Sequence, residues 1–399
     1  MSGRTAAAIP ASSYRPPDGI AAVAWPAFLV GSAALVLTAA GGLANPAQFF
    51  RSYLVAYLYW LSIPLGCSGI AMLHHLSRGA WGLMIRRVLE AAARTLPLTA
   101  LLFAPLLFGL PLLYAWARPG AAREDPTLAH QAVYLNVPFF IARAALYFGL
   151  WCVFSALLDR MSRRQDETGD PRLSRRMQMI SAPGLAIYCL AATFASIDWL
   201  MSLDTHWYST IYGFYFVGGQ AVSALAFVIL VARYLAGRRP MSGVLRPVHF
   251  HDYGKLLLTF VVLWAYFAVS QLIIIWQGNL AGEITWYRGR LLGGWRFVSL
   301  VLALLHFALP FLLLLSRDLK RNAARLSGVA LLLLLMRFVD LYWLAAPAFS
   351  PDRVALHWLD VAAPVALGGI WISLFARELG KRPLLPVNDP FLPEALGHG

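Results

Sequence analysis

The stretch from Ala195 to Gln220 joins two strongly apolar runs and gathers ionisable side chains that those runs lack. It contains Asp198, Asp204 and His206, together with several tyrosines. In an apolar environment such groups are costly and often functional, because carboxylates and imidazoles can pass protons along a chain of donors and acceptors. The stretch therefore indicates a polar pocket or a proton path at the end of membrane helices.

Other residues extend this candidate path. They are Arg143, Tyr266, His306, Arg337, Asp340, His357 and Asp360. Arg337 and Asp340 are three residues apart, as are His357 and Asp360, so each pair shares a helical face. The alternative is that these groups only form ion pairs that fix helix packing, Arg337 with Asp340 and Arg143 with Asp198 or Asp360. His306 could equally be a core histidine bonded to a neighbouring carbonyl or hydroxyl.

Composition identifies the elements that must position these residues. The chain has 399 residues, of which 59% are hydrophobic and only 13% are charged, whereas about a quarter are charged in soluble domains. Ten runs are long and apolar enough to span a bilayer. These are 20–42, 53–76, 96–117, 137–158, 181–202, 211–236, 255–277, 295–316, 325–346 and 355–376. The amphipathic segment 80–95 is expected to lie in the membrane interface.

The sequence thus predicts an all-α integral membrane protein with about ten transmembrane helices. One membrane domain, 20–376, is flanked by a disordered tail, 1–19, and a C-terminal tail, 377–399. Most of the 33 lysines and arginines fall on the side of the membrane that carries the N-terminus, called side A. The positive-inside rule places side A, with both termini, in the cytoplasm, and the opposite side B outside a bacterial inner membrane. Because the basic residues are spread over several loops of one face, nucleic acid is not an expected partner.

The path residues fall mainly in the half nearest side B. Other chemistry finds little support in the sequence. Cys67, Cys152 and Cys189 stand alone in apolar runs, although iron–sulfur clusters and structural zinc need clustered ligands. His306 has no partner histidine at mid-membrane depth that could complete a haem site. Nucleotide-binding and hydrolase motifs are missing as well. We therefore expect this chain to hold no metal or redox cofactor of its own.

Four stretches resemble the membrane subunits of alternative complex III, a family of quinol:cytochrome c oxidoreductases. They are ASIDWLMSLDTHWYSTIYGF (195–214), HDYGKLLLTFVVLWAYFAVSQLIIIWQGNLAGEITWYRGRLLGGW (251–295), SRDLKRN (316–322) and MRFVDLYWLAAPAF (336–349). The chain is most similar to the smaller of the two NrfD-like, or polysulfide-reductase-like, subunits. The similarity covers roughly 180–375 well and the first half of the chain weakly.

The resemblance implies two four-helix bundles plus two flanking helices. It also implies a respiratory electron-transport complex with a larger NrfD-like sister subunit, an iron–sulfur protein and multi-haem cytochrome c subunits, set in lipid. Iron–sulfur clusters and haem c would belong to those partners, while a quinol is a possible ligand here. The smaller subunit would then provide a proton path, or support quinol oxidation in its sister, with no activity alone. The alternatives are a purely structural scaffold of the complex and a secondary transporter.

Overall fold

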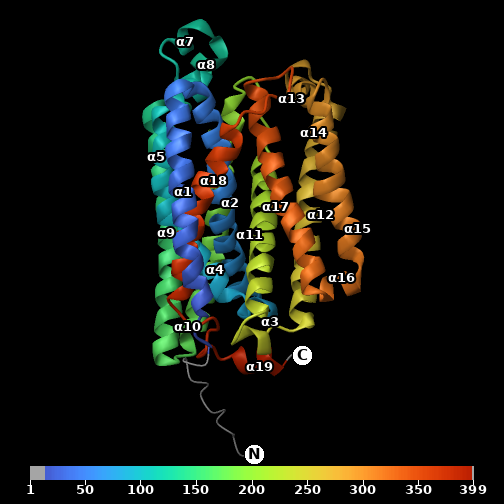
Figure 1. Cartoon of the computed structure of the whole chain (residues 1–399). Coiled ribbons are helices and arrows are strands. Elements are labelled where there is room, and N and C mark those ends of the chain that lie inside the picture. The colour runs from blue at the N-terminus through green and yellow to red at the C-terminus, as the bar shows by residue number, and fades with distance from the viewer. Residues whose placement is uncertain (1–13, 398–399) are drawn as a thin grey trace, which may run out of the picture.

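The computed structural model describes residues 14–397, and these residues form helices with no strand among them. The first 13 residues of the predicted tail 1–19 lie outside the described part. Among these residues, ten helices are long and apolar enough to cross a membrane, as predicted. The first described residues and the C-terminal helix α19 (Leu392–Gly397) lie at the same end of the bundle (Figure 1), as an even number of spans requires. We call this end side A.

The helices of the first half of the chain are α1 (Asp18–Ala44), α2 (Pro46–Ser77), α3 (Ala80–Leu83), α4 (Arg86–Ala93), α5 (Leu96–Phe108), α6 (Leu110–Leu113), α7 (Ala121–Glu124), α8 (Pro126–Gln131), α9 (Val137–Thr168) and α10 (Arg172–Trp199). Side-chain caps define several of their starts. Asn45 accepts a hydrogen bond from the backbone N–H of Gln48 at the start of α2, and Asn136 accepts one from Phe139 at the start of α9. Each cap satisfies a backbone donor that the helix leaves free.

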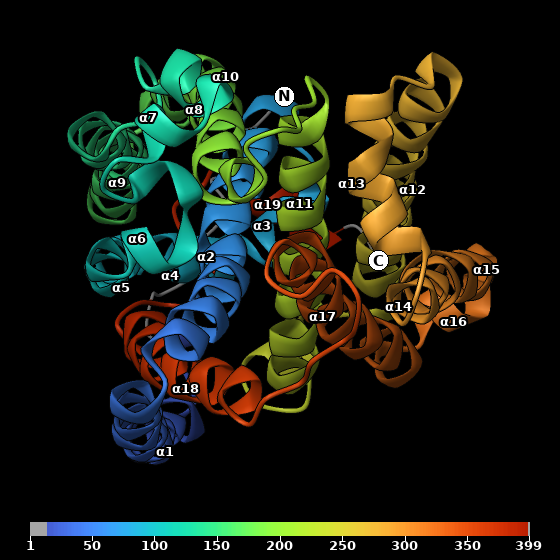
Figure 2. The same cartoon turned by 90° about the horizontal axis from the view of Figure 1, so that it is seen from above.

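The second half contains α11 (Tyr212–Ala236), α12 (Pro247–Gly278), α13 (Ala281–Leu291), α14 (Trp295–Val301), α15 (Leu309–Leu315), α16 (Arg317–Arg321), α17 (Ala323–Ala345) and α18 (Leu359–Gly380). A π-helix, Leu302–Ala308, joins α14 to α15. Viewed from above, α2, α5, α9 and α10 form one group and α11, α12, α14–α15 and α17 form another (Figure 2). Helices α2 and α11 pack together where the groups meet.

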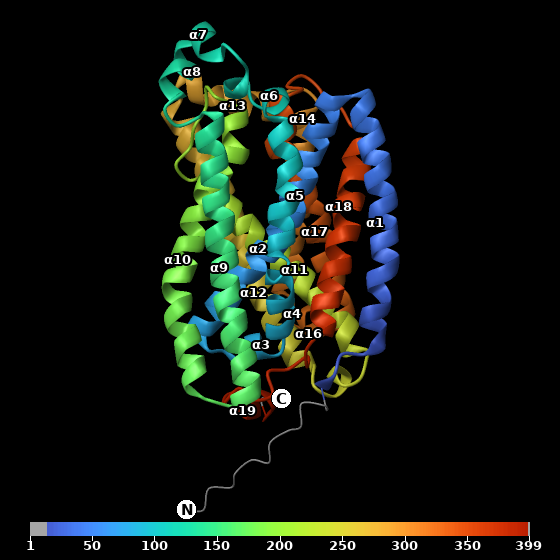
Figure 3. The same ribbon diagram turned by 90° about the vertical axis from the view of Figure 1, so that its left-hand side faces the viewer.

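Helices α1 and α18 pack against each other at one edge of the molecule (Figure 3). Their backbones come into direct contact at a pair of glycines. A Cβ atom added at Gly31 would lie 2.6 Å from the backbone nitrogen of Ile370, and one added at Gly369 would lie 2.5 Å from the Cα of Gly31. Small residues at this crossing allow close helix packing in lipid, where association cannot depend on the hydrophobic effect.

The segment 80–95 does not lie in the interface as expected. All eight residues of α4 are buried, and α4 continues into α5 as a single candidate span, Arg86–Phe108. The polar face of the segment meets buried carboxylates rather than water or lipid head groups. The last residues, 381–397, also pack onto side A, where Leu384, Leu385 and Leu392 are buried.

Candidate proton-transfer site and adjoining cavity

The predicted path residues fall into separate groups within the described structure. The first group surrounds Asp198, which is fully buried at the side B end of α10. Arg143 of α9 binds it through two hydrogen bonds, Nε to Oδ2 at 2.8 Å and Nη2 to Oδ1 at 2.9 Å. The hydroxyl of Tyr147 donates a third, also at 2.8 Å. Such a two-pronged pair is geometrically specific and strong. It is one of the two pairings that the sequence left open for Arg143.

Aromatic rings cover the remaining faces of this arginine. The guanidinium lies 3.8 Å from the ring centroid of Tyr134 and 4.4 Å from that of Phe139, and Nη1 donates to the backbone oxygen of Tyr134 at 2.7 Å. Burial raises the pKa of Tyr134, which lies outside the spans, to about 12. Asp198 and Arg143 therefore form a closed and well-satisfied unit, as expected of a pair that fixes the packing of α9 against α10.

The second group surrounds Asp340 of α17, which is also fully buried. Its carboxylate accepts hydrogen bonds from Arg337, three residues earlier on the same helix, and from the hydroxyl of Tyr215 on α11. The predicted pairing of Arg337 with Asp340 is confirmed. The close approach depends on Gly219, because a Cβ atom there would lie 2.3 Å from the guanidinium of Arg337. The buried arginine is therefore the reason for a glycine at position 219 of α11.

His306 lies beside the second group, in the π-helix. Its ring is 1% exposed and packs edge-on against Trp264 of α12, with 4.0 Å between centroids. Neither ring nitrogen has a hydrogen-bond partner among the described residues. The expected alternative, a histidine bonded to a neighbouring carbonyl or hydroxyl, is therefore wrong for this structure. π-Helical turns often occur at functional sites, and an unbonded buried imidazole is costly.

A cavity of about 270 Å³ adjoins this group. It lies between α11, α12, α13, the π-helix and α17, and Tyr215, the partner of Asp340, forms part of its wall. Trp264, which contacts His306, lines it as well. The buried carboxylate is thus one hydrogen bond away from an internal space, through a hydroxyl that can both accept and donate a proton.

Asp204 and His206 make up a third group, which lies in the turn after α10. Asp204 lines a smaller cavity of about 180 Å³ on side B, which Tyr134 also lines. His206 is largely exposed and pairs with Asp125 across 3.1 Å. Asp125 lies at the start of α8, where the backbone N–H of Thr127 lowers the pKa of its carboxyl. His206 therefore belongs to the surface of side B.

His357 and Asp360 form a fourth group at the start of α18. Asp360 accepts hydrogen bonds from Ser52 Oγ at 2.5 Å, from Gln48 Nε2 at 3.3 Å and from the backbone N–H of His357 at 2.8 Å. These bonds tie the first turn of α18 to α2 and to the residue His357 that precedes the helix, which is a structural role. No hydrogen bond or ion pair within residues 14–397 joins this group to the other three.

Tyr266 does not lie where the predicted path requires it. Its side chain is 63% exposed on the outer face of α12, away from the buried groups, whereas Trp264 and Ala265 of the same turn face inward. The residue therefore cannot extend a path from Asp340. Sequence position gives the depth of a residue in a span, but a single tyrosine does not reveal which face of the helix is covered.

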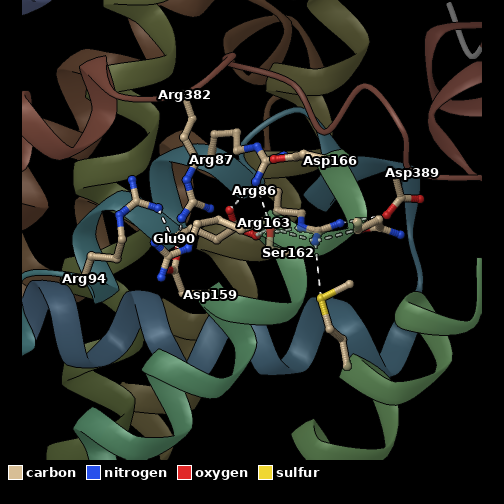
Figure 4. Close-up of polar contacts among 12 residues, drawn as sticks. Arg86, Arg87, Glu90, Arg94, Asp159, Ser162, Arg163, Asp166, Arg382 and Asp389 are labelled. Atoms are coloured by element: carbon tan, nitrogen blue, oxygen red, sulfur yellow. Dashed lines mark hydrogen bonds and ion pairs between the residues drawn. The ribbon is translucent and has the colours of Figure 1, made fainter. Parts of the chain in front are cut away.

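A dense network of charges at side A went unrecognised in the sequence (Figure 4). Arg86 binds Glu90 at 2.8 Å and Asp389 at 2.7 Å, and Arg87 binds the other oxygen of Glu90 at 2.7 Å. Asp159 of α9 accepts from several arginines. Its partners are Arg94 at 3.1 Å, Arg163 at 3.0 Å and Arg382 at 2.7 Å. The sequence feature that could have indicated this network is Glu90. It is a carboxylate near Arg78, Arg86, Arg87 and Arg94 in a chain with only 19 acidic residues.

Arg290 was also missed, because it falls between the predicted spans 255–277 and 295–316, where the sequence indicates only a loop. It is only 3% exposed, and burial lowers its pKa to about 10. It donates to the backbone oxygens of Trp286, Trp343 and Leu344 at 2.8–3.3 Å, and its guanidinium lies 3.6 Å from the Trp286 ring centroid. The last two carbonyls belong to the end of α17, where an arginine satisfies free acceptors and the helix dipole.

The described residues contain no group of three or more histidine, cysteine, aspartate or glutamate side chains that could hold a metal ion. A scan of the chain against protein-family models gives no match, and a search of the curated proteins gives none either. Its function must therefore be argued from the site itself.

Proposed function

We propose that this chain is a membrane subunit of a quinol:cytochrome c oxidoreductase complex and that it provides a proton path in the half of the membrane near side B. The observation that carries the proposal is Asp340, a fully buried carboxylate within a span that hydrogen-bonds Tyr215 at the wall of a cavity. Buried acids in membrane helices are costly and mark proton relays.

The residues suit a two-step relay. Tyr215 gives its hydroxyl proton to the Asp340 carboxylate, which becomes protonated, and takes a proton in exchange from a water molecule that enters the cavity as a hydronium ion or from a quinol hydroxyl there, so that the tyrosine ends as it began. Arg337 stabilises the ionised carboxylate before the transfer. His306, whose ring nitrogens have no hydrogen-bond partner among residues 14–397, is a further acceptor in contact with Trp264.

The other elements of the proposal come from the sequence resemblance. Electrons would pass from quinol to cytochrome c through partner subunits, namely the larger NrfD-like sister subunit, the iron–sulfur protein and the multi-haem cytochromes c. This chain would add no redox centre. The complex would lie in a bacterial inner membrane, with side A in the cytoplasm, which agrees with the basic residues on that side.

A structural role is the second candidate, and the Arg143–Asp198 unit favours it. Both carboxylate oxygens are engaged by one guanidinium, and aromatic rings enclose the pair. If Asp340 behaves in the same way, the chain is a scaffold of the complex and conducts no protons.

The test uses the purified complex carrying Asp340→Asn or Tyr215→Phe, with Asp360→Asn as the matched control. All three variants must first be shown to assemble. The proposal expects quinol:cytochrome c turnover or coupled proton release to fall at least tenfold in the first two and to be unchanged in the control. Intact complexes with wild-type turnover and proton release in all three would favour the scaffold.

A further inference from the structure

A separate pocket of about 220 Å³ lies between α12, α13 and the turn that precedes α11. Helix α13 is at the side B end of the molecule (Figure 1). Trp276 near the end of α12 is 68% exposed, and Tyr208, which lines the pocket, is 66% exposed. Exposed tryptophans and tyrosines gather where a bilayer meets water. The pocket therefore lies at the depth of the lipid head groups.

Glu283 gives this pocket a negative charge that no neighbour balances. The side chain is partly buried in the first turn of α13 and lines the pocket. Its carboxylate makes no hydrogen bond or ion pair within residues 14–397, and no lysine or arginine is among the described residues that line the pocket. A carboxylate partly withdrawn from water is stabilised by a cationic partner. The pocket thus suits an ammonium group.

Gln271 supplies a second polar group without a partner. It is 4% exposed and lines the pocket. Its Oε1 accepts a hydrogen bond from Ser209 Oγ at 3.0 Å, and Ser209 lines the same pocket, whereas Nε2 has no partner among the described residues. A buried donor without an acceptor is costly. Gln271 is seven residues before the end of α12, about 10 Å deeper in the membrane. A ligand that satisfies both groups therefore carries an acceptor oxygen on the bilayer side of its cation.

The pocket continues onto an apolar surface. Ile274 lines it and is 60% exposed, and the neighbouring Ile273 is 46% exposed. Exposed aliphatic side chains within a span face the hydrocarbon chains of the lipid. The ligand that fits all three features is an amphiphile with a cationic end, a middle that contains oxygen and an apolar tail.

We propose that this pocket binds one phosphatidylethanolamine molecule of the side B leaflet. Its ammonium group donates to the Glu283 carboxylate, a phosphate or ester oxygen accepts from Gln271 Nε2, and an acyl chain lies over Ile274. Phosphatidylcholine fits less well, because its quaternary nitrogen has no N–H to donate. Phosphatidylglycerol carries a net negative charge, which Glu283 repels. Lipid binding here needs neither a quinol nor a proton path, so it stands or falls independently of the proposed function.

The experiment is native mass spectrometry of the full chain released from detergent micelles. The micelles are titrated with palmitoyl-oleoyl phosphatidylethanolamine, phosphatidylcholine or phosphatidylglycerol, so that only the head group differs. Glu283→Gln removes the charge, Glu283→Lys reverses it, and Gln271→Leu removes the donor at similar size. Matched controls are Glu124→Gln, an exposed carboxylate on side B, and Gln277→Leu, at the exposed end of α12. Thermal melting first shows that each variant is folded.

The wild-type chain should bind phosphatidylethanolamine about 10-fold more tightly than phosphatidylglycerol, the value of one charge-assisted hydrogen bond. Glu283→Gln should abolish this preference and Glu283→Lys should reverse it. Gln271→Leu should weaken phosphatidylethanolamine binding about 5-fold, and both controls should match the wild-type chain. Because the Glu283 variants change only the start of α13, they remain informative if Gln271→Leu fails to fold.

Equal affinity of the wild-type chain for the three lipids would overturn the inference, as would a preference that survives in Glu283→Lys. Soluble glycerophosphoethanolamine is the competitor that separates a lipid from a free amine. It should not displace the lipid at equal concentration, because it lacks the acyl chains. Displacement by it would show that the pocket recognises a soluble amine and not a lipid.

Discussion

Removing the charge of Asp340 should destabilise the membrane domain strongly, because it leaves Arg337 with a buried charge and no carboxylate. Both side chains are at most 1% exposed. Breaking a buried pair from one side costs about 3–5 kcal/mol. Asp340→Asn and Arg337→Met should therefore each lower the free energy of unfolding by about that amount. The double variant, which buries no charge, should lose no more than the worse single one.

The resulting coupling energy between the two positions is at least about 3 kcal/mol, at or above the upper end of measured pairs. It can be obtained from reversible unfolding in mixed micelles by titration with dodecyl sulfate, monitored by circular dichroism. Arg143→Met combined with Asp340→Asn is the control, because these residues lie in separate groups and should be additive within about 0.5 kcal/mol. Additive losses at Arg337 and Asp340 would refute the claim that the two charges compensate each other.

Three further predictions concern close contacts and charges. Gly219→Ala should cost about 1–3 kcal/mol, since its new Cβ atom would meet the guanidinium of Arg337 at 2.3 Å. Asp389→Asn should release the C-terminal segment, because it removes a carboxylate from buried Arg86, and limited trypsin digestion should cleave faster after Lys381, where that segment begins. Asp125 has a lowered pKa, so it stabilises the α7–α8 loop above its ordinary pKa of about 3.9 and loses that effect as the pH falls through the lowered value. Amide hydrogen exchange in that loop should therefore increase below about pH 4, beyond the change in intrinsic exchange rate.

Controls for these variants lie in the same chain. Gly149→Ala on α9 meets no atom within 4 Å and should be neutral or slightly stabilising. Glu167→Gln, exposed at the end of α9, should leave trypsin cleavage unchanged. Asp125→Asn should remove the extra pH dependence of exchange. Equal effects in Gly219→Ala and Gly149→Ala, or trypsin cleavage of Asp389→Asn at the wild-type rate, would contradict the packing described here.

Helix number and the partner of Arg337 could be predicted because they depend on local features. Ten apolar runs of sufficient length need only the thickness of the bilayer, and residues three apart on a helix must share a face. The Arg143–Asp198 pair was foreseen only as one of two options, since it joins α9 to α10 across a gap that sequence spacing does not measure.

The other features of the site could not be predicted, because they depend on tertiary packing. The amphipathic face of α4 has the same pattern whether it meets lipid head groups or the carboxylates of α9 and the C-terminal segment. Tyr266 and Trp264 are two residues apart in one apolar run, yet one faces outward and the other lines the cavity. In the sequence Gln271 is only a polar residue within the apolar run 255–277. The structure shows that its Oε1 accepts from Ser209 while its Nε2 has no partner among the described residues.

The most direct test of the account is whether Asp340 changes its protonation state while the complex works. Redox-induced infrared difference spectra of the purified complex would show this as a change in a carboxyl C=O band. We predict a band that disappears in Asp340→Asn, shifts in Tyr215→Phe and persists in Asp198→Asn. A difference spectrum without any carboxyl change, or one whose band survives in Asp340→Asn, would show that Asp340 is only the structural partner of Arg337.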